Sequence, residues 1–471
     1  MGIRASSGST NPSGKVFVLS LDGVSHAFME RHCGEGHLPA LGRLLAEGDF
    51  SPLETVRPPV SLVAWASYMT GVNPGMHGIY GFTDRQPGSF DLFVPNGGNI
   101  AQPALWEILS RAGRKVTVVN VPATYPPRPV NGILVAGMLS PSLEEATYPE
   151  EASKQLRRMN YRLDADAHLG KTDRDAFLAD VDLTVRKRFE AAALLLKERE
   201  WDFFQLHVME TDRVNHLFWE DYERPDSPYR EAFLSFYRTL DDLVGELLQR
   251  LPADCDIVLL SDHGFCLLKK QVYVNRFLEE RDWLEFEHRK PRKLADMLPR
   301  SKAYSLMPGR IYLNMRGREP RGCVLGKAEY HGFREGVAAD LLNLRDPDDD
   351  GEVVAEALRG EEVFRNPSWG DFPVAVSEKT PTPCDLLLLP RDGYDLRGNL
   401  DHAELFGRGS VTGMHTVSGA FVYLKGRRIE ASRPHILDLY PTVLEMMGVE
   451  NVEEIEGRSL LQPESENGGK R

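Results

Sequence analysis

The sequence predicts an α/β protein with a doubly wound, mostly parallel sheet sandwiched by helices and a small inserted subdomain. Strand-like apolar runs alternate with helical stretches up to about residue 285, and this β-then-α rhythm is typical of parallel sheets. The rhythm weakens after that point and resumes near residue 381. The chain has 471 residues, 42% of them apolar and 27% charged, which is enough for a large buried core.

The predicted elements follow one another in regular order. KVFVLSLD at 15–22 is a strand that runs into a loop, and LPALGRLLAEG at 38–48 is a helix with a glycine stop. Later pairs are helix 104–113 with strand 115–121, helix 172–200 with strand 201–209, and helix 228–250 with strand 255–261. Strands at 384–390 and 419–426 are assigned to the main sheet, which the amphipathic helix at 435–448 closes.

These elements define a domain organisation. The main α/β core is predicted over 15–284 and 381–462, and the segment 285–380 between them, with its glycine turns and acidic link, as an inserted subdomain. Residues 1–14 and 463–471 are predicted to be a disordered leader and tail.

Charge and cysteine usage exclude several classes of protein. The formal net charge is −14, so the basic footprint of a nucleic-acid or membrane-surface binder is absent. The five cysteines are scattered and form no CxxC pair, which favours a reducing compartment, and we expect a cytoplasmic protein. No apolar run approaches the roughly 18 residues of a membrane span, and the N-terminus has no apolar secretory core. The myristoylation-like start at Gly2 is short enough to be accidental.

Acidic and histidine side chains follow predicted strands. Asp22 ends the first strand, and Asp262 and His263 follow the strand at 255–261. Ligands of open parallel sheets bind outside such strand ends, and carboxylate and imidazole groups suit zinc-like ions. Taken singly, each residue has an ordinary alternative as a turn residue.

Asp212, His216 and His415 extend this set. Asp212 and His216 are four apart, so a helix would place them on one face. For that pair alone, an N-cap Asp212 and an ordinary half-buried His216 are the favoured alternative. His415 lies just before a strand and could be a simple loop histidine. Three aspartates and three histidines at one sheet edge nevertheless predict a two-ion metal site.

Ser61 is the candidate nucleophile. It follows Pro58 and Pro59 and opens a helical pattern that runs to Thr70. Free amides and the helix dipole favour a bound anion at a helix start. Ser61 could instead be a plain N-cap, and the two roles are compatible. Its hydroxyl is a weak nucleophile until a base or a metal ion stabilises the alkoxide.

Together these motifs resemble the alkaline phosphatase superfamily, specifically its type I phosphodiesterase/nucleotide pyrophosphatase branch. The matching pieces are LSLDG at 19–23, Ser61 nine residues before TG, NPGMHGI at 73–79, DRVNH at 212–216, SDHG at 261–264, GMHTVSG at 413–419 and the closing region 437–460. The resemblance covers about residues 15 to 462 apart from the insert.

The resemblance implies the α/β/α fold and a nucleophile that bridges two divalent ions, usually zinc, with manganese or another ion as the alternative. It implies that Asp22, Ser61, Asp262 and His263 surround one ion, and that Asp212, His216 and His415 hold the other. The expected function is a phosphodiesterase or nucleotide pyrophosphatase that acts on a small phosphate ester, a nucleotide among the candidates, through phospho-Ser61.

Some positions depart from the family pattern. Nucleotide pyrophosphatases usually carry threonine as nucleophile and an asparagine three residues on, where this chain has Ser61 and Ala64. The backbone amide of Leu62 is the candidate replacement for that phosphoryl-oxygen donor. Sulfatases carry a proline and an arginine where this chain has Val63 and Trp65, so a sulfatase is a poor match.

The sequence is less informative about which residues bind the substrate. Trp65 and Tyr80 could stack on a base or aryl group, although core packing is the favoured alternative. Arg310, Tyr312 and Asn314 could reach the site from the insert and bind the leaving group. We interpret the remaining histidine candidates as structural or surface residues: His77, His207 and the cluster His32, Cys33 and His37. A phosphomonoesterase, a hydrolase of a phosphonate or phospholipid headgroup, and a non-catalytic metal-binding homologue remain alternatives.

Overall fold

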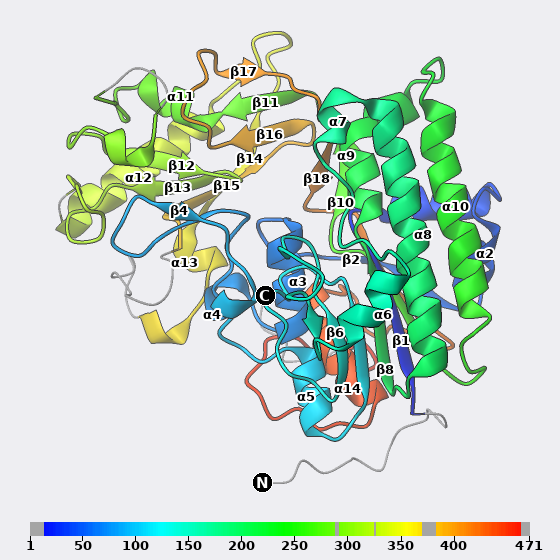
Figure 1. The fold of residues 1–471 in the computed structure, drawn as a ribbon. Coiled ribbons are helices and arrows are strands. Elements are labelled where there is room, and N and C mark those ends of the chain that lie inside the picture. Colours follow the sequence, from blue (N-terminus) through cyan, green and yellow to red (C-terminus); the bar gives the residue numbers. More distant parts are fainter. Residues whose placement is uncertain (1–13, 288–291, 325, 370–382, 463–471) are drawn as a thin grey trace. The chain divides into compact units, whose positions relative to one another are not determined.

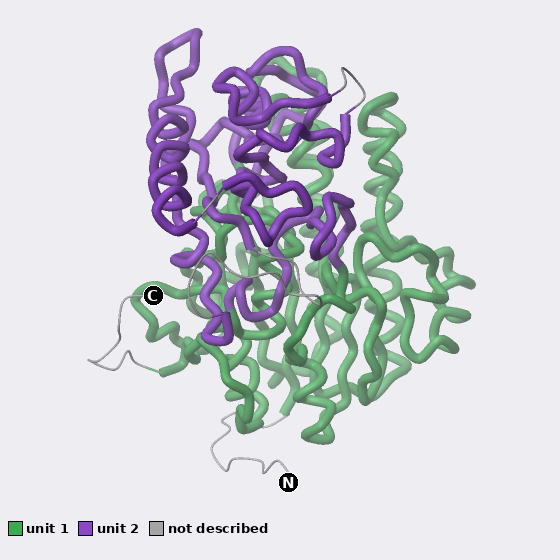
Figure 2. The backbone as a smooth tube through the Cα atoms, turned by 90° about the vertical axis from the view of Figure 1, so that its left-hand side faces the viewer, with its two compact units in different colours: residues 1–72, 96–265, 415–471 green, residues 73–95, 266–414 purple. Residues whose placement is uncertain are grey.

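The computed structural model describes residues 14–287, 292–324, 326–369 and 383–462. The predicted tail and all but the last residue of the predicted leader lie outside these ranges. The chain divides into two compact units, which Figure 2 distinguishes by colour. Unit 1 comprises residues 1–72, 96–265 and 415–471, and unit 2 comprises residues 73–95 and 266–414.

Unit 1 is built on an eight-stranded sheet with the order β2-β19-β9-β1-β8-β5-β6-β7. At its centre β1 (Val16–Leu21) is parallel to both of its neighbours, β8 (Phe203–Val208) and β9 (Asp256–Leu260). β5 (Val116–Val119) and β6 (Gly132–Val135) continue the parallel run. The antiparallel strands are β2 (Gly48–Leu53), β7 (Thr147–Tyr148) and β19 (Ala420–Lys425). The predicted mostly parallel sheet is confirmed.

The central strands are buried on both faces. Every residue of β1 and β8 is buried, which explains why both strands are nearly continuous apolar runs rather than alternating patterns. Ser20 and His207 interrupt these two runs near their carboxyl ends, where they lie opposite each other in the parallel register.

Two groups of helices flank this sheet (Figure 1). One group contains α2 (Pro39–Leu45), α8 (Arg174–Glu198), α9 (Glu210–Glu223) and α10 (Arg230–Leu248). The other contains α3 (Ser61–Thr70), α5 (Leu105–Arg111) and α14 (Leu439–Met446). The shorter helices of this unit are α1 (His26–Gly34), α6 (Ala152–Arg158) and α7 (Leu169–Thr172). The predicted α/β/α sandwich is therefore observed.

Unit 2 has its own sheets. Its four-stranded antiparallel sheet has the order β12-β13-β15-β14, made of Ala303–Leu306, Arg310–Leu313, Leu386–Pro390 and Val354–Arg359. A second sheet joins β16 (Tyr394–Arg397), β11 (Lys270–Tyr273) and β17 (Phe406–Gly407), and β3 (Asp84–Arg85) pairs with β4 (Leu92–Phe93). The helices are α4 (Pro74–His77), α11 (Val274–Glu279), α12 (Gly326–Leu342) and α13 (Gly360–Val363). The chain passes between the units within β10 (Gly264–Leu267) and β18 (Gly413–Thr416).

The division at these junctions differs from the predicted insert at 285–380, because unit 2 runs from Cys266 to Met414 and takes in residues 73–95. The assignment of residues 384–390 to the main sheet is wrong, since this strand is β15 and pairs with β13 and β14. A continuous apolar run predicts a buried strand but does not specify which sheet the strand joins. None of the described helices has the length and apolar character needed to span a membrane.

Asp241 illustrates how the helices of unit 1 depend on one another. The N-cap residue of α2 is Leu38, whose side chain cannot accept a hydrogen bond. The amides of Ala40 and Leu41 instead donate to the two carboxylate oxygens of Asp241 on α10, at 2.9 and 2.8 Å. One helix therefore receives its cap from another.

We expect Asp241→Ala to lower the free energy of unfolding by about 2 kcal/mol, because two buried amides lose their acceptor. Urea denaturation measures this change. The control is Asp242→Ala at the exposed neighbouring position, which should stay within about 0.5 kcal/mol of the unsubstituted protein. Equal unfolding midpoints for the two variants would contradict the capping role.

Candidate active site

The predicted site residues meet at the carboxyl ends of the three central strands of unit 1. Asp22 directly follows β1, Asp262 follows β9 after one residue, and α9 begins two residues after β8. Because β1 pairs in parallel with both other strands, their ends lie at one edge of the sheet. The expectation that one sheet edge brings these distant segments together is confirmed.

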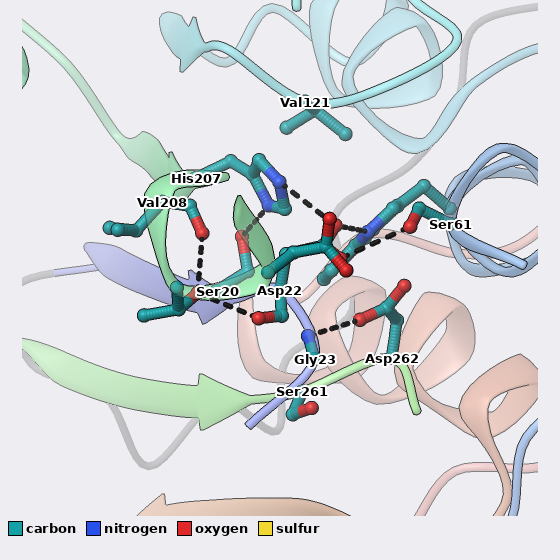
Figure 3. Close-up of polar contacts among 12 residues, drawn as sticks. Ser20, Asp22, Gly23, Ser61, Val121, His207, Val208, Ser261 and Asp262 are labelled. Atoms are coloured by element: carbon teal, nitrogen blue, oxygen red, sulfur yellow. Dashed lines mark hydrogen bonds and ion pairs between the residues drawn. The ribbon is translucent and has the colours of Figure 1, made fainter. Parts of the chain in front are cut away.

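A first group of ligand atoms belongs to Asp22, Asp262 and His263, all of them fully buried and within 4.8 Å of one another. His263 Nε2 lies 3.3 Å from Asp262 Oδ2 and 3.5 Å from Asp22 Oδ1. The amide of Gly23 donates to Asp262 Oδ1 at 3.1 Å (Figure 3). Two carboxylates and one imidazole thus point at a common centre.

A second group is formed by Asp212, His216 and His415. Asp212 Oδ1 is 3.0 Å from His415 Nε2 and 3.3 Å from His216 Nε2, and the two Nε2 atoms are 2.9 Å apart. Asp212 and His216 lie one turn apart on α9, as predicted. The N-cap of that helix is Met209, so the alternative role of Asp212 as an N-cap is wrong.

The two groups adjoin each other. The rings of His263 and His415 are stacked, with their centroids 3.7 Å apart. One ring belongs to each group, so the structure brings the six predicted aspartates and histidines into one place within unit 1.

Ser61 lies beside the first group. It is the first residue of α3, and the N-cap is Val60, so the alternative role of Ser61 as a capping side chain is wrong. Its hydroxyl instead donates to Asp22 Oδ1 at 3.1 Å and lies 3.3 Å from His263 Nε2. Figure 3 shows Ser61 and Asp262 on the same side of the Asp22 carboxylate. The amides of Ser61 and Leu62, in the first turn, have no helical carbonyl to bind.

The imidazole tautomers suit metal ligation. His263 Nδ1 is 3.1 Å from the carbonyl oxygen of Gly264, and His415 Nδ1 is 3.0 Å from that of Pro59. A carbonyl oxygen only accepts, so Nδ1 of each ring carries a proton. Nε2, on the side of the carboxylates, is therefore the nitrogen available to a metal ion, which is the arrangement that backbone acceptors impose on metal-binding histidines.

Electrostatics also favour cations at the site. Burial, together with the charge of Asp22, raises the pKa of Asp262 well above its ordinary value. No hydrogen-bond donor within the described residues reaches Asp262 Oδ2. Burial alone would raise the pKa of Asp22, but the adjacent imidazoles of His207 and His263 hold it well below its usual range. Buried carboxylates that crowd one another in this way call for a bound cation.

The second group behaves similarly. Burial opposes ionisation of Asp212, but His216 and His415 lower its pKa to about 2. The donor set of carboxylate oxygens and imidazole nitrogens therefore fits divalent metal ions in both groups.

His207 and Trp65 complete the surroundings of Asp22, and sequence reasoning missed both roles. Trp65 Nε1 donates to Asp22 Oδ2 at 2.8 Å, and His207 Nε2 lies 3.3 Å from the same oxygen. His207 Nδ1 is 3.1 Å from Ser20 Oγ (Figure 3). The signal for His207 was its place at the carboxyl end of a central strand, opposite Ser20. Trp65 is 0% exposed, so core packing, the favoured alternative for this residue, is what the structure shows, together with the bond to Asp22.

The other residues predicted to contact the substrate, Arg310 and Tyr312, are already bonded or packed within unit 2. Arg310 is 0% exposed, donates to Asp84 Oδ1 at 2.6 Å and also bonds to the carbonyl oxygens of Thr83 and Met307. Tyr312 is buried and stacks on Tyr304, with the ring centroids 5.2 Å apart. These side chains are already bonded or packed, so they are poor candidates for binding a leaving group. Asn314 and Tyr80 are buried as well, and core packing, the favoured alternative for Tyr80, is what the structure shows.

Solved structures with a similar fold come from bacteria and mammals. Phosphonoacetate hydrolase from Sinorhizobium meliloti, in complex with phosphonoformate, is 18% identical, with a TM-score of 0.64 over 95% of this chain and 100% of that chain. An inactive variant of murine ectonucleotide pyrophosphatase/phosphodiesterase 5 in complex with AMP is 13% identical, with a TM-score of 0.55 over 94% and 97% of the two chains. The human form of that protein is 12% identical, with a TM-score of 0.54 over the same shares.

Sequence comparison identifies the family. No curated protein sequence gives a significant match. The family model described as type I phosphodiesterase / nucleotide pyrophosphatase matches residues 16–417, a range that includes Ser61 and both ligand groups. The chain therefore belongs to the type I phosphodiesterase/nucleotide pyrophosphatase family, in the alkaline phosphatase superfamily, and is a hydrolase of phosphoric esters.

Proposed function

We propose that this protein hydrolyses small phosphodiesters, nucleotides among them, through a covalent phospho-Ser61 intermediate. The observation that carries the proposal is the placement of the Ser61 hydroxyl. It lies at the start of α3, bonded to Asp22 Oδ1 at 3.1 Å and next to His263 Nε2 at 3.3 Å. A hydroxyl placed among metal-type ligands and at a helix N-terminus has the surroundings that activate a serine toward phosphorus.

Two divalent ions, zinc first and manganese as the alternative, are part of the proposal. Asp22, Asp262 and His263 would hold one ion beside Ser61, and Asp212, His216 and His415 would hold the other. When bound, such ions would lower the pKa of the serine hydroxyl and neutralise charge on the phosphoryl oxygens. The buried carboxylates and the two oriented Nε2 atoms support this assignment.

The proposed reaction has two steps, and in each step one bond to phosphorus forms while another breaks. Ser61 Oγ forms a bond to phosphorus while the bond from phosphorus to the leaving alcohol breaks and that alcohol takes up a proton. The amide of Leu62, in the first turn of α3, is the candidate donor to a phosphoryl oxygen. Water then attacks phosphorus and the bond to Ser61 Oγ breaks, which returns the free hydroxyl. The net reaction converts a diester and water into a monoester and an alcohol.

Several observations bear on the choice of substrate. The family description names phosphodiesters and nucleotide pyrophosphates, and the murine relative was captured with AMP. The Sinorhizobium meliloti enzyme is described with phosphonoacetate, so phosphonates and monoesters belong in the same substrate comparison. We also propose a cytoplasmic location, in keeping with the five cysteines, all of which are free thiols.

Ser61→Ala should lower kcat/KM for bis-nitrophenyl phosphate by roughly 10³-fold or more, because the attacking oxygen is removed. Bound zinc should change little, since the six carboxylate and imidazole ligands remain. Ser67→Ala, on the same helix and equally buried, is the matched control and should keep most of the activity. An Ser61→Ala enzyme that retained wild-type turnover would refute the covalent mechanism.

Mass spectrometry of acid-quenched enzyme tests the intermediate directly. A phosphoryl group should appear on the peptide that contains Ser61 during turnover. Parallel assays with nitrophenyl phosphate and phosphonoacetate test the substrate class. We expect the diester to give the highest kcat/KM. A larger value for the monoester or for the phosphonate would replace the phosphodiesterase assignment while leaving the role of Ser61 intact.

Trp65→Phe should weaken zinc binding about 10-fold or more, because Asp22 Oδ2 loses the indole donor that orients it. Competition with a zinc-binding dye measures the affinity. The control is Trp106→Phe, another buried tryptophan of unit 1, which should leave zinc affinity unchanged. If both variants bind zinc as tightly as wild type, the indole does not support the metal site.

A further inference from the structure

The turn that ends α1 carries a second set of metal-type side chains. Glu35 is the C-cap residue, and Gly36 has φ +76°. The amide of His37 donates to the carbonyl oxygen of His32 at 2.9 Å. The amide of Gly36 donates to the carbonyl oxygen of Cys33 at 3.1 Å. This is the Schellman pattern, in which the side chains at the positions of His32 and His37 usually make an apolar contact. Here that contact is made by two imidazoles.

The ligand atoms of this turn have spacings that suit one ion. His32 Nδ1 and His37 Nδ1 are 3.0 Å apart, and His37 Nδ1 is 3.4 Å from Glu35 Oε2. All three side chains offer ligand atoms within 4.8 Å of one another. Zinc bonds of about 2.0–2.2 Å in a tetrahedron separate neighbouring ligand atoms by roughly 3.3–3.6 Å. The two spacings that involve His37 are within a few tenths of an ångström of this range.

The surrounding contacts orient His32 as a ligand. Its side chain is buried against Phe28, with the ring centroids 4.3 Å apart. Its Nε2 lies 3.0 Å from the hydroxyl of Tyr222 on α9. When Nε2–H donates to that hydroxyl, the Nδ1 lone pair faces His37. Metal-binding histidines commonly use their other ring nitrogen in this way.

Glu35 and Cys33 have clearly different roles in the turn. Arg31 Nε donates to Glu35 Oε1 at 3.0 Å, which leaves Oε2 as the oxygen nearest His37. Cys33 Sγ turns instead toward Met29 Sδ at 3.7 Å. The side chains of Glu35 and His37 are 43% and 47% exposed, so an ion can enter from solvent and keep water in its remaining position.

We propose that His32, Glu35 and His37 form a separate binding site for a divalent transition-metal ion of the zinc type. Two imidazole nitrogens and one carboxylate oxygen are a donor set that such ions accept. The site shares no residue with the groups around Ser61. A bound ion would join His37, in the turn after α1, to the ring of His32. That ring also contacts the hydroxyl of Tyr222 on α9.

The test counts zinc ions. Full-length protein is stripped with a chelator, reloaded with excess zinc, desalted and analysed by inductively coupled plasma mass spectrometry. His37→Gln should carry about one zinc ion fewer per chain than wild type, because one of three ligands is lost. Glu35→Gln should show a loss in the same direction. His168→Gln, which changes another exposed histidine of unit 1, is the control and should match wild type.

The two proposals can fail separately in this experiment. Equal zinc contents in wild type, His37→Gln and Glu35→Gln would overturn the second site, whatever the ions near Ser61 do. A wild-type content too low for two ions near Ser61 would count against the proposed function, yet the difference between wild type and His37→Gln would still report on the turn. Circular dichroism of each variant shows that the fold is retained, since His37 is half exposed.

Discussion

The burial of the Asp22 carboxylate is the constraint on which the rest of the site depends. A fully buried carboxylate is costly unless hydrogen-bond donors or cations surround it. Its two oxygens contact Ser61 and Trp65 from α3, His207 from β8 and His263 beyond β9. The backbone of Asp22 is hydrogen-bonded as well. Its amide donates to the carbonyl oxygen of Val208, and its carbonyl oxygen accepts from the hydroxyl of Thr211. One residue thus ties the central strands to the two helices that carry the chemistry.

Local features of the structure could be predicted from the sequence, whereas contacts between distant segments could not. The alternation of strands and helices and the polar residues at strand ends are local patterns, so Asp22, Asp262 and His263 could be placed at one edge of a parallel sheet. Partners across the sheet are not local. His207 was interpreted as a structural or surface residue because no ligand-like spacing accompanies it in the sequence. Its contact with Asp22 depends on the register of β1 and β8. The same limit applies to β15, whose apolar run fits either sheet.

Helix boundaries show a finer limit of sequence reasoning. Pattern analysis locates the start of α3 to within a few residues, yet a single residue decides what Ser61 does. With the boundary at Val60, the Ser61 hydroxyl is directed to Asp22 rather than to the helix amides. For α9, the cap falls at Met209 and leaves the Asp212 carboxylate to the histidines. The cluster of His32, Cys33 and His37 was interpreted as structural or surface for a related reason, because the sequence does not show that a Schellman turn brings His37 back onto His32.

The absence of a side-chain cap on α3 has a consequence for how this chain could be redesigned. A capping side chain contributes about 1 kcal/mol to a helix, and α3 does without that contribution because valine occupies the N-cap. The helix therefore does not depend on the identity of residue 61 for its own formation. Capping and reactivity are therefore separate at this position, and the hydroxyl of Ser61 contributes to folding through its bond to Asp22 instead. An engineer could exchange the attacking atom there, oxygen for sulfur for example, without altering the cap of the helix.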